Sequence, residues 1–283
     1  MADTLLLLIK LSVGAMILAV GMGATFADVA YLWRRPALLL RSVLAMYVLV
    51  PLAAFVLAEF LPLAPGVRVA LLVIAVSAGA PLLPRRLRFG GSPYVFSLVV
   101  TSSLLAIVLV PAWLAVLSRH FDVAIHVGTA DVAAVLARAF LLPLVIGILL
   151  GMALRRMVPA RTERIADTVF ALAAVVLAVA TLILIADQWQ VFTEVRGPGI
   201  VALLALMVIS VAIGHALGGP NPDDRTALAI ACCTRHIGIV VILAATFRGP
   251  RAVVLLAVYL VAASAVSIPY LRWRRRTAPA DKP

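Results

Sequence analysis

The chain has 283 residues, of which 65% are hydrophobic and only 13% are charged, and its formal net charge is +12 at pH 7. Its mean hydropathy is +1.17. A soluble domain of this composition would expose far too much apolar surface, so the sequence indicates an integral membrane protein. The positive charge does not indicate a nucleic-acid partner, because the arginines stand in short clusters between apolar runs, where they set membrane orientation.

Nine apolar runs are long enough to cross a bilayer, which takes about 17 to 25 helical residues. None shows the period-2 alternation of a strand, so we predict an all-α membrane protein with about nine transmembrane helices. One transmembrane domain covers residues 1–283, with a short polar tail at 277–283. The predicted spans are 5–26, 37–59, 67–83 with a continuation to 89, 94–117, 132–154, 165–186, 199–217, 226–247 and 252–270.

Basic residues are distributed unequally between the two sets of loops. One set is rich in arginine, whereas the other holds little beyond Arg68, Arg119, Arg196, Arg248 and Arg251. The positive-inside rule therefore places the C-terminus in the cytoplasm and, with nine spans, the N-terminus outside. The excess of arginine over lysine suggests a bacterial inner (plasma) membrane. The rich set is Arg34, Arg35, Arg85, Arg86, Arg88, Arg155, Arg156, Arg161, Arg164, Arg225, Arg272, Arg274, Arg275 and Arg276.

Two spans are interrupted, and their polar or proline residues mark the predicted site. In the eighth span Arg235 and His236 interrupt an apolar run, and an arginine at bilayer depth costs roughly 2.5 to 3.5 kcal/mol on insertion scales. In the third span Pro81 and Pro84 remove backbone donors. Paired broken spans indicate an inverted-repeat transporter with a midplane site. The predicted substrate- or ion-binding residues are Arg235, His236, Thr234, Ala80, Pro81, Thr101, Ser102 and Ser103.

Several short motifs follow one another along the chain: Gly21-Met22-Gly23, Arg35-Pro36, Val50-Pro51-Leu52, Leu141-Leu142-Pro143 with Ile146-Gly147, the segment PDDRTALAIACCTRHIGIVVILAA at 222–245, and Ile268-Pro269-Tyr270. Their order and spacing resemble the bile acid:sodium symporter family over nearly the whole chain. The resemblance implies a panel domain and a core domain that move against each other, with the two broken helices, at about 67–89 and 226–247, crossing in the core. It also implies transport of organic anions such as bile acids, sulfonated steroids and small carboxylates, usually with sodium.

The chain departs from the sodium-coupled members of that family at the eighth-span break. Alignment on Gly238 puts Ala231 where those members carry a glutamate, Arg235 at a glutamine and His236 at an asparagine. Because sodium prefers several oxygen ligands, the loss of the carboxylate argues against a sodium site. A guanidinium at Arg235, which is always protonated, can supply the positive charge instead. We therefore predict a sodium-independent carrier of a small organic anion, with no cofactor.

Other interpretations stay open. Arg235 can bind carbonyls of the broken third span as a purely structural link, and His236 can be a hydrogen-bonded structural histidine or a proton carrier. The function classes are a sodium-independent secondary carrier, a sodium-coupled symporter and a non-transporting membrane sensor. An enzyme is not expected, because the motifs of metal-assisted and serine hydrolysis and of ATP binding are missing from the sequence. The adjacent Cys232 and Cys233 indicate helix packing rather than a metal site.

Overall fold

The computed structural model describes residues 2–77, 79, 93–121, 129–187, 197–235 and 251–277. Within these residues the chain is helical and contains no β-strand, in agreement with the predicted all-α class. Three of the described helical stretches are long and apolar enough to cross a membrane: Pro36–Phe60, Pro93–Phe121 and Gly197–Leu217. Chain composition and these helices identify a multi-pass membrane protein.

Each predicted span overlaps a described helix, but only the three stretches named above are long and apolar enough to cross a membrane, so the count of nine spans stays a prediction. The first predicted span overlaps α1 (Ala2–Met22). The second overlaps a run of three elements, α3 (Pro36–Leu44), η1 (Ala45–Leu49) and α4 (Val50–Phe60). The third overlaps α5 (Pro65–Val76), and the fourth overlaps α6 (Pro93–Phe121). The fifth span overlaps another run of three elements, α7 (Thr129–Leu136), η2 (Ala137–Leu141) and α8 (Leu142–Met157). The sixth to ninth spans overlap, in order, α9 (Thr162–Asp187), α11 (Gly197–Leu217), α12 (Pro222–Cys233) and α14 (Arg251–Thr277). Two short elements, α2 (Phe26–Val29) and η3 (Pro159–Arg161), lie in connections.

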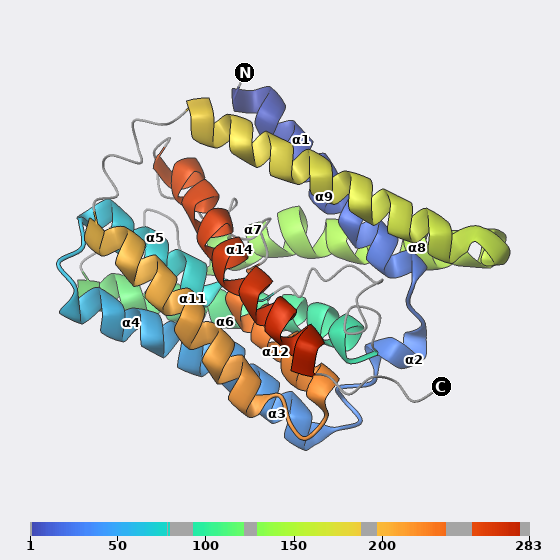
Figure 1. Cartoon of the computed structure of the whole chain (residues 1–283), viewed down its shortest axis with the longest axis horizontal. Coiled ribbons are helices and arrows are strands. Elements are labelled where there is room, and N and C mark those ends of the chain that lie inside the picture. Colours follow the sequence, from blue (N-terminus) through green and yellow to red (C-terminus); the bar gives the residue numbers. More distant parts are fainter. Residues whose placement is uncertain are drawn as a thin grey trace.

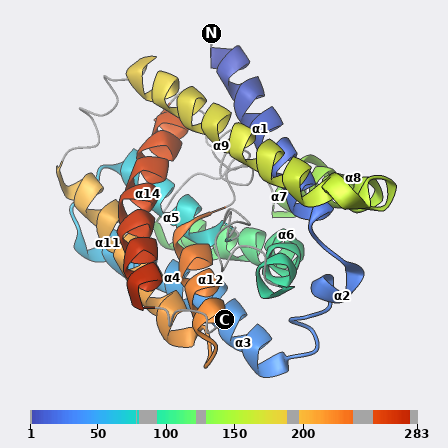
Figure 2. The same ribbon diagram turned by 45° about the vertical axis from the view of Figure 1, so that its right-hand side comes forward.

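The helices form two groups (Figures 1 and 2). In one group α1 packs along α9 and α8. In the other, α12 lies among α11, α14, α6 and η1, while α11 also packs on α4. The groups meet where α14 touches α9 and where α6 touches α7. All residues of α12 from Thr226 to Cys233 are buried, so this helix is the centre of its group.

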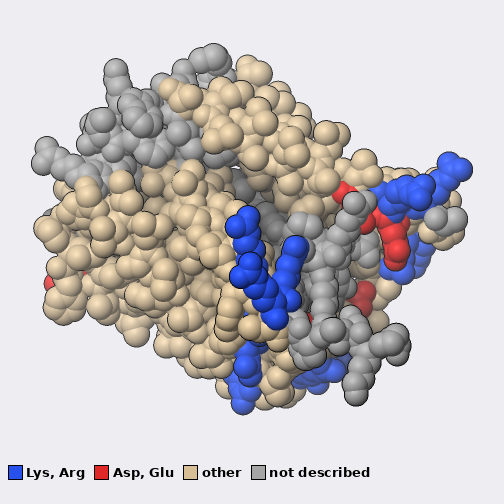
Figure 3. Space-filling model, viewed as in Figure 1, with Lys and Arg blue, Asp and Glu red and all other residues tan. Residues whose placement is uncertain are grey.

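The outer surface is apolar, as lipid requires. On α9 the side chains of Leu172, Val175, Val179 and Leu182 are exposed at helical spacing. Figure 3 shows a broad uncharged surface over α4 and α11, with Lys and Arg gathered near the last turns of α14 and at the far end of α8. Charged groups thus lie near helix ends, where water and lipid headgroups are accessible.

A proline inside the second span shows how local sequence and tertiary packing combine. Pro51 has no backbone N–H, so the carbonyl of Tyr47 loses its helical donor, and the preceding segment η1 is π-helical. The indole Nε1 of Trp113, in α6, donates to the Tyr47 carbonyl at 2.6 Å. The proline therefore creates an acceptor through which α6 is fixed against the second span.

Glycines let α1 and α8 approach closely. A Cβ at Gly21 would lie 2.6 Å from the carbonyl oxygen of Ile148, and one at Gly151 would collide with the backbone of Leu18 and Met22. Because these obstacles are backbone atoms, they cannot rotate away. Small residues at such contacts are the usual means by which membrane helices gain van der Waals contact.

We predict that Gly21→Ala and Gly151→Ala each lower the free energy of unfolding by about 1–3 kcal/mol, because the added methyl forces the two backbones apart. The matched control is Gly14→Ala on the same helix, where a Cβ meets no atom within 4 Å. The control should be neutral or slightly stabilising. Thermal unfolding in detergent distinguishes these outcomes, and equal midpoints for all three variants would contradict the close packing.

Candidate functional site

The two interrupted spans meet beside Arg235. Helix α5 ends at Val76 and Ser77 is extended, while α12 ends at Cys233 and Thr234 is extended. An antiparallel β-bridge then pairs Gly79 with Arg235. The contact is tight, since a Cβ at Gly79 would collide with the carbonyl of Ala231 and the Met46 side chain. We call this meeting point the crossing.

The guanidinium of Arg235 is buried at the crossing, with 1% of the residue's surface exposed. Its Nη1 donates to the carbonyl of Ser77 at 3.0 Å and to that of Met46 at 3.4 Å. Ser77 follows the last residue of α5, so no N–H of that helix is available to donate to its carbonyl. Arg235 therefore joins the end of α12 to the end of α5 and to the second span.

Two nitrogens of the same guanidinium, Nε and Nη2, have no hydrogen-bond partner within the described residues. No described ion pair includes Arg235 either. The sequence around it contains no acidic residue in 60–121 or 225–277, so neither interrupted span brings a carboxylate. A buried guanidinium without an anion retains strong attraction for one, because its charge is poorly compensated in a low-dielectric interior.

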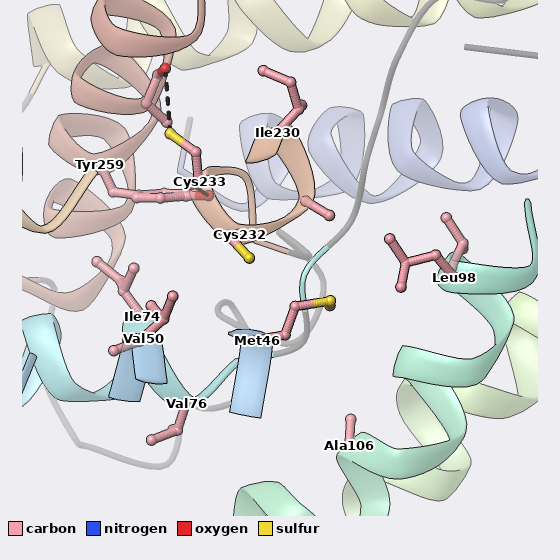
Figure 4. Packing of buried hydrophobic residues seen from close by; sticks show 14 of the residues in the cluster. Met46, Val50, Ile74, Val76, Leu98, Ala106, Ile230, Cys232, Cys233 and Tyr259 are labelled. Atoms are coloured by element: carbon pink, nitrogen blue, oxygen red, sulfur yellow. Dashed lines mark hydrogen bonds between the residues drawn. The ribbon is translucent and has the colours of Figure 1, made fainter. Parts of the chain in front are cut away.

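Tyrosine hydroxyls hold the backbone around the crossing. The Arg235 backbone N–H donates to the hydroxyl of Tyr259 in α14, which in turn donates to the carbonyl of Cys233 at 3.3 Å. The hydroxyl of Tyr47 donates to the carbonyl of Ser102. Figure 4 shows the Tyr259 side chain reaching Cys233 and the Cys232 side chain directed toward Met46. Tyr259 thus fixes the end of α12 to α14, and Tyr47 joins the second span to α6.

The predicted hydroxyl residues of α6 are buried but have different partners. Ser102 donates to the carbonyl of Gly79 at 3.0 Å, so it belongs to the crossing. Ser103 donates to the carbonyl of Val99 in its own helix at 2.7 Å. Thr101 Oγ1 is buried and has no partner within the part of the chain that the structure describes. Thr234 donates to the Ile230 carbonyl at 2.7 Å.

The structure therefore brings together Arg235, Thr234 and Ser102, while Ala80, Pro81 and His236 lie outside the described residues. The sequence interpretation did not identify Tyr259, Tyr47 and Met46. A signal for the tyrosines existed, because each stands in an apolar span and a buried tyrosine hydroxyl usually has a partner. Nothing in the sequence marked Met46, whose carbonyl accepts from Arg235 and whose side chain lies against Gly79.

The cysteines of α12 are free and buried. Cys233 Sγ lies 3.8 Å from Met207 Sδ and 3.4 Å from the hydroxyl of Ser267, whereas Cys232 faces the other side of the helix. No group of three His, Cys, Asp or Glu side chains with metal-binding geometry occurs among the described residues.

We predict that Tyr259→Phe lowers the free energy of unfolding by about 1–3 kcal/mol, because it leaves the Arg235 N–H and the Cys233 carbonyl without a partner in the interior. The control is Tyr31→Phe, since among the described residues the hydroxyl of Tyr31 meets the exposed Arg35 side chain alone. Chemical or thermal unfolding of both variants provides the comparison. A loss for Tyr259→Phe no larger than that for Tyr31→Phe would show that the hydroxyl does not hold the crossing.

The chain is similar to one family of known proteins. The model of the Sodium Bile acid symporter family matches residues 10–195, from α1 through α9. The matched region includes α5, Ser77 and Gly79, and it ends before α11, α12 and Arg235. No curated protein matched the chain. The match covers well over half of the sequence and agrees with the order of motifs described above, so the chain belongs to the sodium bile acid symporter family.

Proposed function

We propose that this membrane protein is a secondary transporter of a small organic anion, and that it works without sodium. Membership of a symporter family supports transport. The observation that carries the proposal is the buried guanidinium of Arg235, which has two free donor nitrogens among the described residues. Such a group favours an anionic ligand with paired oxygens, because a guanidinium presents its donors as a planar fork.

Sodium independence follows from what surrounds Arg235. Its Nη1 donates to the carbonyls of Ser77 and Met46, which are oxygens that a bound cation would otherwise coordinate. The hydroxyl of Ser102 already donates to Gly79. A fixed positive charge at this point would repel a second cation. Arg235 thus takes the place of a bound ion in holding the two interrupted spans together.

Transport would proceed by alternating access. In this proposal α1, α8 and α9 form the panel, and the helices around α12 form the core, with about nine spans arranged as inverted repeats. The core would move against the panel across the contacts of α14 with α9 and of α6 with α7. The C-terminus faces the cytoplasm and the N-terminus faces outward, in a bacterial plasma membrane. His236 would be the proton carrier if transport is coupled to protons.

The second candidate is a sodium-coupled symporter, and the family match favours it, because the family takes its name from sodium-coupled bile acid transport. Its sodium ligands would be backbone carbonyls together with hydroxyls such as that of Thr101, which is buried without a described partner. The two candidates differ in one measurable property, which is whether sodium binds to the folded protein.

We predict equal thermal midpoints for the purified protein in sodium chloride and in potassium chloride at the same ionic strength. A ligand that binds only the folded state stabilises it by mass action, which amounts to about 2.7 kcal/mol at a hundredfold excess over Kd. Lithium chloride serves as a further control for cation-specific effects. A rise seen only in sodium would overturn sodium independence and favour the symporter.

We further predict that Arg235→Gln reduces uptake of radiolabelled taurocholate into proteoliposomes at least about tenfold, because removing one partner of a buried charge contact costs roughly 2 kcal/mol or more. Arg235→Lys keeps the positive charge but loses the planar fork of donors. Its uptake rate should therefore fall between those of the unmodified protein and of Arg235→Gln. Arg138→Gln, at an exposed arginine of η2, is the control. Uptake by Arg235→Gln at the rate of the unmodified protein would exclude a transport role for the guanidinium.

A further inference from the structure

A second polar site lies at one end of the bundle, away from the crossing. A pocket of about 320 Å³ opens between the start of α3 and the turn that joins α11 to α12. Its polar or turn-forming lining consists of Arg35, Pro36 and Arg41 on one side and Pro220, Asn221 and Asp224 on the other. None of these residues takes part in the contacts of Arg235 described above.

The turn that forms one wall is rigid. Gly219 has a φ of 83°, a conformation that favours glycine, and it comes directly before Pro220. The guanidinium of Arg225 donates to the Gly219 carbonyl from Nε at 3.3 Å and from Nη2 at 3.0 Å. The Asn221 side chain accepts from the Asp223 N–H at 2.9 Å and so caps α12. The pocket wall is therefore held in place by its own hydrogen bonds.

Asp224 is the unusual residue of this pocket. It precedes the predicted span at 226–247, and only 5% of its surface is exposed. Within the described residues its carboxylate has no hydrogen bond and no ion pair, although Arg35 influences it electrostatically. Burial raises the pKa of Asp224 to about 6, with the Arg35 charge opposing this shift and the Asp223 charge adding to it. A buried, unpaired carboxylate attracts a cationic partner.

The opposite wall favours an anion. Arg35 and Arg41 both line it, and both are exposed. Arg35 is held by the hydroxyl and ring of Tyr31, with the guanidinium carbon 4.0 Å from the ring centre. Guanidinium groups bind phosphate oxygens through paired donors. The pocket thus presents cations on one side and a carboxylate on the other.

The pocket also lies where a polar region meets an apolar one. Next to Arg35, Trp33 is 55% exposed, and exposed tryptophan is typical of the membrane–water interface. Along the same stretch Leu40, Leu44 and Val48 are exposed four residues apart, so they share one face that leads away from the pocket. An acyl chain attached to a headgroup in the pocket would have an apolar surface to follow.

We propose that this pocket binds a phosphate ester that also carries a primary ammonium group, in the form of the headgroup of phosphatidylethanolamine. The phosphate lies against Arg35 and Arg41, and the ammonium lies against Asp224. A lipid in this position bridges α3 and the α11–α12 turn, and therefore bears on the end of α12 opposite the crossing. This binding is independent of the transported anion.

The test uses the purified full-length protein in dodecylmaltoside at pH 7.5, with phosphatidylethanolamine, phosphatidylglycerol or phosphatidylcholine added. Phosphatidylethanolamine should raise the thermal midpoint by about 2 °C or more above the other two lipids, because it alone offers both the phosphate and a primary ammonium. Native mass spectrometry of the same samples gives relative affinities. Asp224→Asn should remove the preference for phosphatidylethanolamine over phosphatidylglycerol, a change of at least about tenfold in relative affinity.

Arg41→Gln is a second variant at an exposed position, so it does not depend on whether Asp224→Asn folds well. It should weaken binding of phosphatidylethanolamine and of phosphatidylglycerol alike, whereas Arg34→Gln, whose side chain does not line the pocket, should change neither. Equal stabilisation by all three lipids, a preference for phosphatidylethanolamine that survives in Asp224→Asn, or unchanged lipid binding in Arg41→Gln would overturn the proposal. Soluble glycerophosphoethanolamine that binds as tightly as the lipid would show that the ligand is a water-soluble phosphoamine instead.

Discussion

The structure depends on one buried cation at the point where two helices end. Helices α5 and α12 both stop inside the bundle, and a helix that stops there leaves carbonyl groups that water cannot reach. The guanidinium of Arg235 donates to one of these carbonyls, at Ser77, and to Met46 in the second span. A neutral side chain of the same length would leave these acceptors without a cationic donor. The same contact ties the extended residues after α5 to those after α12, where Gly79 pairs with Arg235.

In the proposed function, the same cation takes the part that sodium has in the sodium-coupled members of the family. A bound sodium ion and a buried guanidinium both bring one positive charge to a set of carbonyl oxygens. The guanidinium, however, belongs to the protein and cannot leave, and it offers directional donors rather than a coordination sphere. The proposed function assigns an anion to its two remaining donors, which have no partner among the described residues, and so links the structural role of Arg235 to transport.

Two kinds of contact hold the helices together. Glycines bring backbones into direct contact between α1 and α8, as at Gly21 and Gly151, and between α11 and α12, as at Gly214, and such a contact has little freedom to rearrange. Around α12, hydroxyl and indole groups complete the hydrogen bonding of irregular backbone, as Tyr259 does for Arg235 and Trp113 does for Tyr47. The irregular backbone is tolerated at membrane depth because it is buried in protein. The group around α12 therefore has the polar contacts that a binding site needs.

The sequence by itself determined the membrane class, the all-helical fold and the family. These follow from one-dimensional properties, which are the lengths of apolar runs, the positions of prolines and the order of motifs. It also marked Arg235, because a charge in an apolar run is visible without knowing its neighbours. It did not determine which carbonyls Arg235 would bind, nor that the tyrosines of α14 and η1 would face the crossing, because those contacts join residues 24 to 189 positions apart. Only the tertiary structure decided them, since hydrogen-bond partners are set by where helices end in space rather than by where they end in the sequence.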